Sequence, residues 1–237
     1  MPKLTEINKK YGYRSIFDHF SLELAENKVS VIMGVSGIGK TTLLNILAGL
    51  ENVDGKVEAE KPVSYVFQSD RLIKHLTIRQ NLEFVLKNAE IGRPKEVVID
   101  EMLETVGLLP RANSYPTELS GGEKQRVSIA RAFVYPAKTL LLDEPFSSLD
   151  YGLKMQLMSL LTDLLQKNNR TVVYVTHDVD EALALSDDVY ILDANKVIYK
   201  KSLTKTCGLR PTTGSDADLI RAELYDVLLK LGGNTER

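Results

Sequence analysis

The nine residues GVSGIGKTT, Gly34 to Thr42, stand between an apolar run, VSVIM at 29–33, and a stretch with helical spacing, KTTLLNILAGL at 40–50. The spacing G-x-x-x-x-G-K-[ST] between a strand and a helix is the pattern of a phosphate-binding P-loop. Its backbone N–H groups can point at phosphate oxygens, its lysine can reach the outer phosphates of a nucleotide, and the next threonine can ligate Mg²⁺. An ordinary glycine-rich turn is the competing interpretation, and it does not explain why motif and context agree. The candidate nucleotide-binding residues are Gly34, Ser36, Gly37, Gly39, Lys40, Thr41 and Thr42.

The composition limits the class of protein. A chain of 237 residues, 43% of them hydrophobic, can build one large domain or two small ones. The formal net charge of −2 lacks the basic field of nucleic-acid binders, so we expect no nucleic-acid partner. The single cysteine, Cys207, excludes an intramolecular disulfide and indicates a reducing compartment. The N-terminus has no signal-peptide core, and no stretch approaches the roughly 20 apolar residues that cross a bilayer. We therefore expect a cytosolic chain that reaches a membrane only through a partner.

Strand-like and helix-like patterns alternate along the chain and predict an α/β fold. The β-type segments are 4–33, 62–68, 139–144, 171–177 and a hairpin at 189–200. The segment from about 71 to 137 is helical, and the pair Thr77 and Gln80 forms a capping box ahead of one of its helices. A helix over 153–167, a linker at 208–215 and an amphipathic helix at 216–231 complete the pattern. The apolar face of that last helix is assigned to Leu219, Ile220, Leu224, Val227, Leu228 and Leu231.

These patterns predict one domain over residues 1–237 with three parts. An α/β core of about 1–70 and 138–203 is interrupted by a helical subdomain of about 71–137, and a C-terminal linker and helix cover about 204–237.

Polar side chains follow two of the apolar strands. TLLLDEP ends in Asp143 and Glu144, and VTHD places His177 just past the next strand. Ligands bind at the carboxyl ends of parallel strands, so one site could gather these residues with the P-loop. Asp143 is placed to hold Mg²⁺, Glu144 is the candidate base or water-orienting group, and His177 could contact the terminal phosphate. Taken alone, a solvated acidic turn explains the two carboxylates equally well, and a lone histidine is more often structural or exposed. The P-loop in the same chain favours the catalytic interpretation of these residues.

Two further residues are candidates by position. Gln68 lies at the end of the strand SYVFQ, where the helical segment begins, and its amide could coordinate Mg²⁺ and the attacking water when nucleotide is present. Tyr11, in KKYGY ahead of the P-loop, has an aromatic face that could stack on adenine. Tyr13 is a nearby competitor for that role, and a packing role for Tyr11 remains an alternative.

A second anion-binding pattern, LSGGEKQR at 119–126, lies in the helical segment. Ser120 with Glu123 makes a capping box, which predicts that a helix begins here. Adjacent glycines let backbone N–H groups approach a ligand, and a helix N-terminus attracts phosphate. The chain therefore carries two phosphate-binding patterns.

In their order along the chain, these motifs resemble those of the ATP-binding subunits of ABC transporters. The resemblance rests on Tyr11, GVSGIGKTT, Gln68, LSGGEKQR, TLLLDEP, SSLD at 147–150 and VTHD. It implies a P-loop NTPase fold of the ABC-ATPase type, with a mostly parallel core sheet, an N-terminal antiparallel β part and an inserted helical subdomain. Val35 stands where many members have proline, and Thr41 replaces the commoner serine but keeps the hydroxyl.

The same resemblance implies roles for single residues, with ATP and Mg²⁺ as the cofactors. Adenine stacks on Tyr11, Gln68 is the Q-loop residue, and Asp143 is the Walker B aspartate. Glu144, His177 and Lys40 carry the catalytic roles, and Thr41, Gln68 and Asp143 hold the metal. The signature residues are Ser120, Gly121, Gly122 and Gln125, and Asp150 closes the D-loop.

The resemblance also implies partners. Two subunits face each other head to tail as a homodimer, and each ATP lies between the P-loop of one and the signature of the other. Transmembrane permease subunits hold the dimer at the cytoplasmic face of the membrane, and an extracytoplasmic substrate-binding protein acts indirectly. Leu72, Ile73 and Leu76 are expected to bind a short helix of the permease. The segments at 67–82 and 209–228 are similar to those of the nitrate/sulfonate/taurine importer group.

The expected function is ATP hydrolysis that powers solute transport, with import favoured by the separate, short chain. The alternatives are an ABC-type ATPase for export or lipoprotein release, a soluble ABC ATPase, a small-molecule P-loop kinase and a module that binds nucleotide without hydrolysis. The signature argues against the kinase, and Glu144 with His177 argues against the inactive module.

Overall fold

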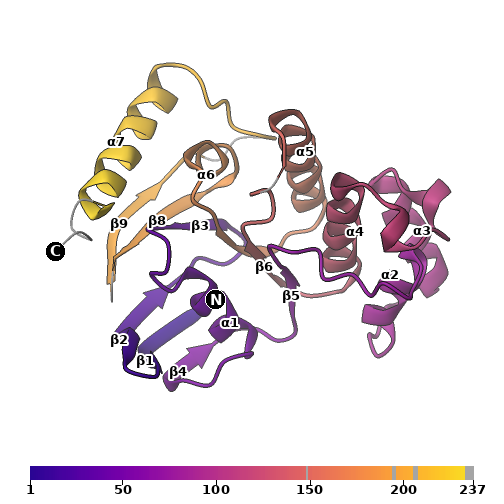
Figure 1. The fold of residues 1–237 in the computed structure, drawn as a ribbon, viewed down its shortest axis with the longest axis horizontal. Coiled ribbons are helices and arrows are strands. Elements are labelled where there is room, and N and C mark those ends of the chain that lie inside the picture. The colour runs from indigo at the N-terminus through magenta and orange to yellow at the C-terminus, as the bar shows by residue number, and fades with distance from the viewer. Residues whose placement is uncertain (148, 194–195, 205–207, 233–237) are drawn as a thin grey trace.

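The computed structural model describes residues 1–147, 149–193, 196–204 and 208–232. Two sheets and the helices around them form an α/β core, and a group of helices extends from one end of it (Figure 1). Ser148 of the SSLD stretch, the 194–195 turn of the predicted hairpin and Cys207 lie outside the described residues.

The strand that leads into the P-loop lies inside a six-stranded sheet of order β5-β6-β7-β3-β8-β9. Five of these strands run parallel, and only β9 pairs antiparallel, with β8. The predicted mostly parallel core is therefore confirmed. Strands β6 and β7 are buried along their whole length, as expected of central strands covered on both faces. The strand bounds are β3 (Val29–Met33), β5 (Val63–Val66), β6 (Thr139–Asp143), β7 (Thr171–Val175), β8 (Asp188–Asp193) and β9 (Lys196–Ser202).

A second, antiparallel sheet of order β2-β1-β4 packs on the P-loop side of the core. Its strands are β1 (Lys3–Tyr11), β2 (Arg14–Glu23) and β4 (Asp54–Glu58). The sequence did not predict β4, because its residues DGKVE are polar and mostly exposed and it exists only by pairing with β1. Helix α1 (Lys40–Ala48) lies between the sheets and shares one apolar cluster with both, including Phe17, Leu43 and Tyr190.

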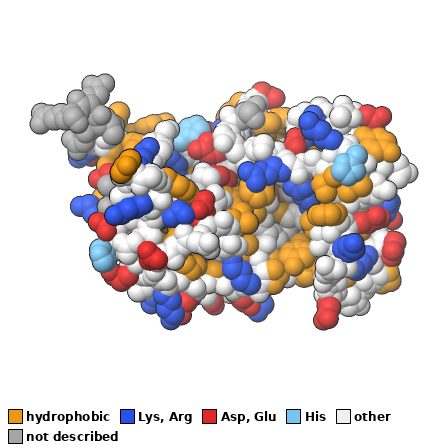
Figure 2. Space-filling view, turned by 60° about the horizontal axis from the view of Figure 1, so that its bottom comes forward, with side chains coloured by type: hydrophobic (Ala, Val, Ile, Leu, Met, Phe, Trp, Pro, Cys, Tyr) orange, Lys and Arg blue, Asp and Glu red, His pale blue; other side chains and the backbone are white. Residues whose placement is uncertain are grey.

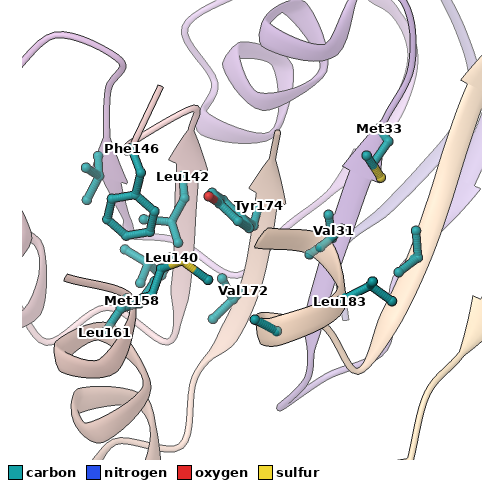
Figure 3. Packing of buried hydrophobic residues seen from close by; sticks show 14 of the residues in the cluster. Val31, Met33, Leu140, Leu142, Phe146, Met158, Leu161, Val172, Tyr174 and Leu183 are labelled. Carbon is teal, nitrogen blue, oxygen red and sulfur yellow. The ribbon is translucent and has the colours of Figure 1, made fainter. Parts of the chain in front are cut away.

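The opposite face of the large sheet packs against α5 (Tyr151–Lys167) and α6 (Val179–Leu185). Figure 3 shows Leu140, Met158 and Leu161 meeting beside α5, while Leu183 of α6 approaches the sheet near Val31. Helix α7 (Ser215–Gly232) covers the edge of this layer. Its Leu224 and Leu231 are buried, but Leu219 is 70% exposed, so its assignment to the apolar face was wrong. A helix rotates by about 100° per residue, so Leu219 points away from the face that its neighbour Ile220 presents to the core.

The predicted helical subdomain is present and has its own apolar core. It contains α2 (Ile78–Leu86), α3 (Lys95–Thr105), α4 (Gly121–Val134) and the 3₁₀ turns Leu109–Arg111 and Pro116–Glu118. Both predicted capping boxes form, at Thr77 with Gln80 and at Ser120 with Glu123. Within the described ranges, no helix has the length and apolar character that a membrane span requires.

Candidate functional site

The P-loop is shaped by tight contacts with the small sheet. Gly39 caps the N-terminus of α1 at a φ of 109°, and a Cβ atom there would lie 2.6 Å from Cγ2 of Ile16. Only glycine fits such a left-handed backbone at so close an approach. The Lys40 ammonium donates to the carbonyl oxygens of Gly34 at 2.8 Å and Val35 at 3.0 Å. Burial lowers the pKa of Lys40, while Glu144 and Asp143 nearby oppose that shift.

The predicted metal ligands come together where β6 meets α1. The Thr41 hydroxyl donates to Oδ1 of Asp143 at 3.1 Å, and the Tyr65 hydroxyl lies 3.5 Å from Oδ2. Burial raises the pKa of Asp143 although the hydrogen bond from Thr41 opposes it, so a cation would relieve the cost of the buried charge. Thr41, Asp143 and Gln68 line one cavity of about 300 Å³. Gln68 lies two residues beyond the end of β5, not at the end of that strand as predicted.

This donor set fits Mg²⁺. A hydroxyl, a carboxylate and an amide oxygen are the hard ligands that Mg²⁺ binds, usually with water and phosphate oxygens completing its shell. The described residues hold no cluster of three or more His, Cys, Asp or Glu side chains that could bind a metal without nucleotide.

Glu144 and His177 also lie together, although 33 positions separate them in the chain. Nδ1 of His177 is 3.0 Å from Oε2 of Glu144, and the Glu144 N–H donates to the Val175 carbonyl oxygen at 2.9 Å. Glu144 has a φ of 44°, a left-handed conformation that costs free energy and that commonly marks functional sites. The histidine side chain is 63% exposed and the glutamate 21%, so the pair faces outward from the strand ends.

Two further residues, Tyr11 and Arg14, flank the first turn of the small sheet, and Arg14 contacts the P-loop. The Tyr11 hydroxyl donates to Oε1 of Glu51 at 2.8 Å, and the Lys9 ammonium lies 4.9 Å from the centroid of the Tyr11 ring. Tyr13 is fully exposed. Of the two tyrosines, Tyr11 is the one held in place. Arg14 donates to the Gly37 carbonyl oxygen at 2.8 Å, and sequence reasoning missed it because no motif spacing marks this residue.

The signature residues lie in the helical subdomain, apart from the P-loop that opens α1 (Figure 1). Ser120 accepts from the Glu123 N–H at 3.3 Å while its own N–H donates to Oε2 of Glu123 at 2.8 Å. Gly121 is exposed, and Gly122 packs so closely that a Cβ atom would lie 2.6 Å from Cδ2 of Leu153. Gln125 is only 6% exposed, which places its side chain inside the subdomain. Asp150, the predicted D-loop residue, caps α5 by accepting from the Leu153 N–H at 3.0 Å.

Comparisons with known proteins agree with this geometry. Residues 17–147 match the ABC transporter family. The aliphatic sulfonates import ATP-binding protein SsuB of Mycobacterium sp. (strain MCS) is 39% identical over 193 residues, which cover 81% of this chain and 79% of that protein. The spermidine/putrescine import ATP-binding protein PotA of Hahella chejuensis is 42% identical over 202 residues, which cover 80% of this chain and 55% of that protein. The chain therefore spans about half the length of this second relative.

A solved structure shows the same fold. The dimeric ATP-binding cassette MJ0796, in a post-hydrolysis state with ADP and Pi bound, is 30% identical with a TM-score of 0.76, over 87% of this chain and 100% of that one. The fold and the site together define a P-loop ATPase. More specifically, the chain belongs to the ABC transporter family and is one of its ATP-binding subunits.

Proposed function

We propose that this chain hydrolyses ATP, as one half of a homodimer, to power the import of a small solute through permease subunits. The contact that carries this proposal is the 3.0 Å approach of His177 to Glu144 beside the Thr41–Asp143 pair. Glu144 is the base and His177 orients it, and both lie with the phosphate-binding P-loop at one edge of the sheet. A module that only binds nucleotide needs neither the base nor the residue that orients it.

In this mechanism, Glu144 accepts the proton of the attacking water, and His177 fixes the orientation of the Glu144 carboxylate through Nδ1. The backbone N–H groups of Gly37 and Gly39 bind phosphate oxygens, and Lys40 leaves the carbonyl oxygens of Gly34 and Val35 to stabilise charge on the outer phosphates. Mg²⁺, when bound with the nucleotide, would be held by Thr41, Asp143 and Gln68 and would neutralise phosphate charge.

The signature of a second subunit completes the site. The described residues that line the Thr41–Asp143 cavity include none from the signature, and α4 extends away from α1 in the same chain. Ser120 and Gly121, at the N-terminus of α4, are both exposed, so a phosphate held by another copy can approach this helix end. A head-to-tail homodimer forms two complete sites from these halves.

Mixing two inactive variants tests this arrangement. Lys40→Ala disables the P-loop and Ser120→Arg blocks the signature, so neither homodimer should hydrolyse ATP. In the mixed dimer one site carries both changes and the other carries neither. Hydrolysis should return in the mixture to about half that of the parent in the heterodimer fraction. If heterodimers form and no activity returns, the proposed action in trans, or the independence of the two sites, is wrong.

The membrane partner would bind beside Gln68. A groove of about 320 Å³ lies between the β5 edge, α2 and α4, and its apolar walls include Val63, Val85 and Tyr135. Ile73 and Leu76 are half-buried near the start of α2, whereas Leu72 is only 7% exposed and belongs to the core of the subdomain. The expected contribution of Leu72 to this surface is therefore wrong. Figure 2 shows hydrophobic side chains near the middle of one face, with basic and acidic side chains interspersed around them.

We propose the nitrate/sulfonate/taurine group as the class of importer. The sulfonate relative from Mycobacterium avium (strain 104) aligns with 95% of this chain and 91% of its own length, whereas the polyamine relative is much longer. Co-purification of the chain with its permease, followed by vesicle uptake of labelled sulfonates and of polyamines as the control, tests this class. A Val85→Asp variant should lose the permease while keeping its basal ATPase activity.

A further inference from the structure

The switch residue His177 sits on a loop whose two flanking residues are both held by one ionic network. Thr176 donates through its hydroxyl to Oε2 of Glu181 at 2.7 Å, and Asp178 accepts from the Lys154 ammonium at 2.6 Å. Lys154 also lies 2.8 Å from Oε1 of Glu181, so a single lysine reaches both carboxylates. The exposed histidine is thus carried by a loop that is fixed on either side.

The inner part of the network is shielded from water, whereas the Asp178 side chain is 31% exposed. The side chains of Glu181 and Lys154 are 2% and 18% exposed, and the Tyr174 hydroxyl donates to the same Glu181 oxygen as Thr176. Asp178 also uses its second oxygen to cap α6, accepting from the N–H groups of Asp180 at 2.8 Å and Glu181 at 3.2 Å. The largely buried pair of Lys154 and Glu181 is screened less by salt than an exposed pair and holds Lys154 in a defined geometry.

Lys154 projects from a part of the chain that is itself fixed. It lies in the first turn of α5, which Asp150 caps, and its neighbour Leu153 packs against Gly122 of the signature. The same helical turn therefore contacts the signature helix on one side and, through Lys154, the loop of His177 on the other. Neither the P-loop motif nor the signature motif contains this lysine.

We propose that Lys154 is a positioning residue that holds the switch loop of its own subunit, so that His177 meets Glu144 in the geometry needed for hydrolysis. This inference rests on the proposed catalytic roles of Glu144 and His177. It assigns to Lys154 no contact with the nucleotide, so the loss of Lys154 should leave ATP binding intact and slow turnover.

Two variants remove the link in different ways. Lys154→Met removes the cation, and Asp178→Asn removes only the loop's half of the pair while its amide oxygen can still cap α6 and Lys154 keeps Glu181. Both should lower kcat on the order of 10-fold or more, because small displacements of catalytic groups are costly. The KM for ATP should stay within about 2-fold of the parent. Lys154→Arg should restore most of kcat.

Matched controls separate this role from general effects of charge. Asp180→Asn makes the same chemical change two residues further on, where the carboxylate pairs with Arg221 of α7 at 2.7 Å and not with α5. Lys167→Met makes the matching change at the exposed far end of α5. Both should keep the parental kcat. Thermal unfolding and binding of a fluorescent ATP analogue verify that each variant is folded.

Mixed dimers locate the effect. When Ser120→Arg and Lys40→Ala subunits are combined, the working site uses His177 of the Ser120→Arg subunit. Asp178→Asn placed in that subunit should lower the recovered activity on the order of 10-fold. The same change in the Lys40→Ala subunit should leave it unaltered. Equal losses in both placements, or parental kcat in Lys154→Met, would overturn the proposal. An inactive parental mixture counts against the trans arrangement instead, and the homodimer kcat, KM and Lys154→Arg rescue then decide the role of Lys154.

Discussion

Nδ1 of His177 lies 3.0 Å from Oε2 of Glu144, and the glutamate reaches this position through a left-handed backbone with a φ of 44°. The contact joins the loops after two adjacent parallel strands, β6 and β7. It fixes the carboxylate that we propose as the base. A strained backbone conformation persists only where the surrounding structure holds it, and such conformations cluster at functional sites. The strain at Glu144 is therefore consistent with a functional role for the orientation of its side chain.

Glu144→Gln should therefore separate binding from turnover. The amide keeps the size of the side chain but cannot accept the proton of water, so hydrolysis should fall on the order of 100-fold or more. ATP binding should persist, and ATP should stabilise the dimer, which size-exclusion chromatography with light scattering can detect. A variant with parental hydrolysis would refute the role of Glu144 as base.

Gly39→Ala should damage the P-loop through sterics alone. The new Cβ atom would lie 2.6 Å from Cγ2 of Ile16 at a φ of 109°, so we expect a loss of about 1–3 kcal/mol in the free energy of unfolding. ATP affinity should fall as well, because the loop must shift. Gly92→Ala is the control: nothing lies within 4 Å of its added Cβ, and stability should change by less than about 0.5 kcal/mol. Urea unfolding of both variants measures the difference.

Tyr11 and Tyr13 can be distinguished by their effects on nucleotide affinity. A stacked base contributes about 1–3 kcal/mol, so Tyr11→Ala should raise the KM for ATP by about 10-fold with little change in kcat. Tyr13→Ala should have no effect, because that side chain is fully exposed. Tyr11→Phe keeps the ring and loses only the hydrogen bond to Glu51, so its KM should lie near that of the parent. A larger effect at Tyr13 than at Tyr11 would reverse the assignment.

The pair of Lys154 and Asp178 should also appear in the pH dependence of stability. Burial is the largest single influence on Asp178 and raises its pKa, but the hydrogen bond and charge of Lys154 together with the N–H groups of Glu181 and Asp180 outweigh it, so the net pKa is lowered. The pKa of Lys154 is raised, because its bonds to Asp178 and Glu181 outweigh its own burial. The lowered pKa of the carboxyl group means that its pair stabilises the fold above the ordinary value of about 3.9, and this stabilisation is lost in acid. The raised pKa of the lysine means that its pairs stabilise the fold below about 10.4, and this stabilisation is lost in alkali.

Lys154→Met should accordingly lower the free energy of unfolding on the order of 3 kcal/mol near neutral pH. The difference in the free energy of unfolding between variant and parent should shrink as the pH falls through the lowered pKa of Asp178. It should shrink again as the pH rises past the ordinary lysine range. Lys230→Met is the control, because its pair with Asp226 is exposed and should contribute less than about 1 kcal/mol. A deficit that is the same at every pH would show that packing, not the ion pair, is responsible.

Local patterns were enough to predict the elements around the P-loop. The apolar run before Gly34 became β3, the leucines after it became the buried face of α1, and Gly49 ends that helix at a φ of 77°. Both capping boxes formed for the same reason, since they depend on residues three positions apart. The order of the motifs also indicated the ABC transporter family before any contact was known.

Contacts between distant residues were beyond those patterns. Strand β4 is polar and depends on an edge of β1, and Leu219 is exposed because of how α7 rotates against the core. Leu72 is buried although its neighbours suggested a docking surface. Each outcome depends on how segments that are distant in the chain pack against one another, and local periodicity carries no information about that packing.

The residue types of the site could be read from the sequence: a lysine and a threonine where the P-loop enters a helix, and two carboxylates and a histidine at or just past the ends of strands. The tertiary structure alone decided which of them touch. Parallel pairing of β6 with β7 brings Glu144 to His177, and the packing of α5 between the signature helix and the switch loop lets Lys154 hold Asp178. The physical reason is that ion pairs and hydrogen bonds act over a few ångströms, and only folding brings positions so far apart in the chain within that range.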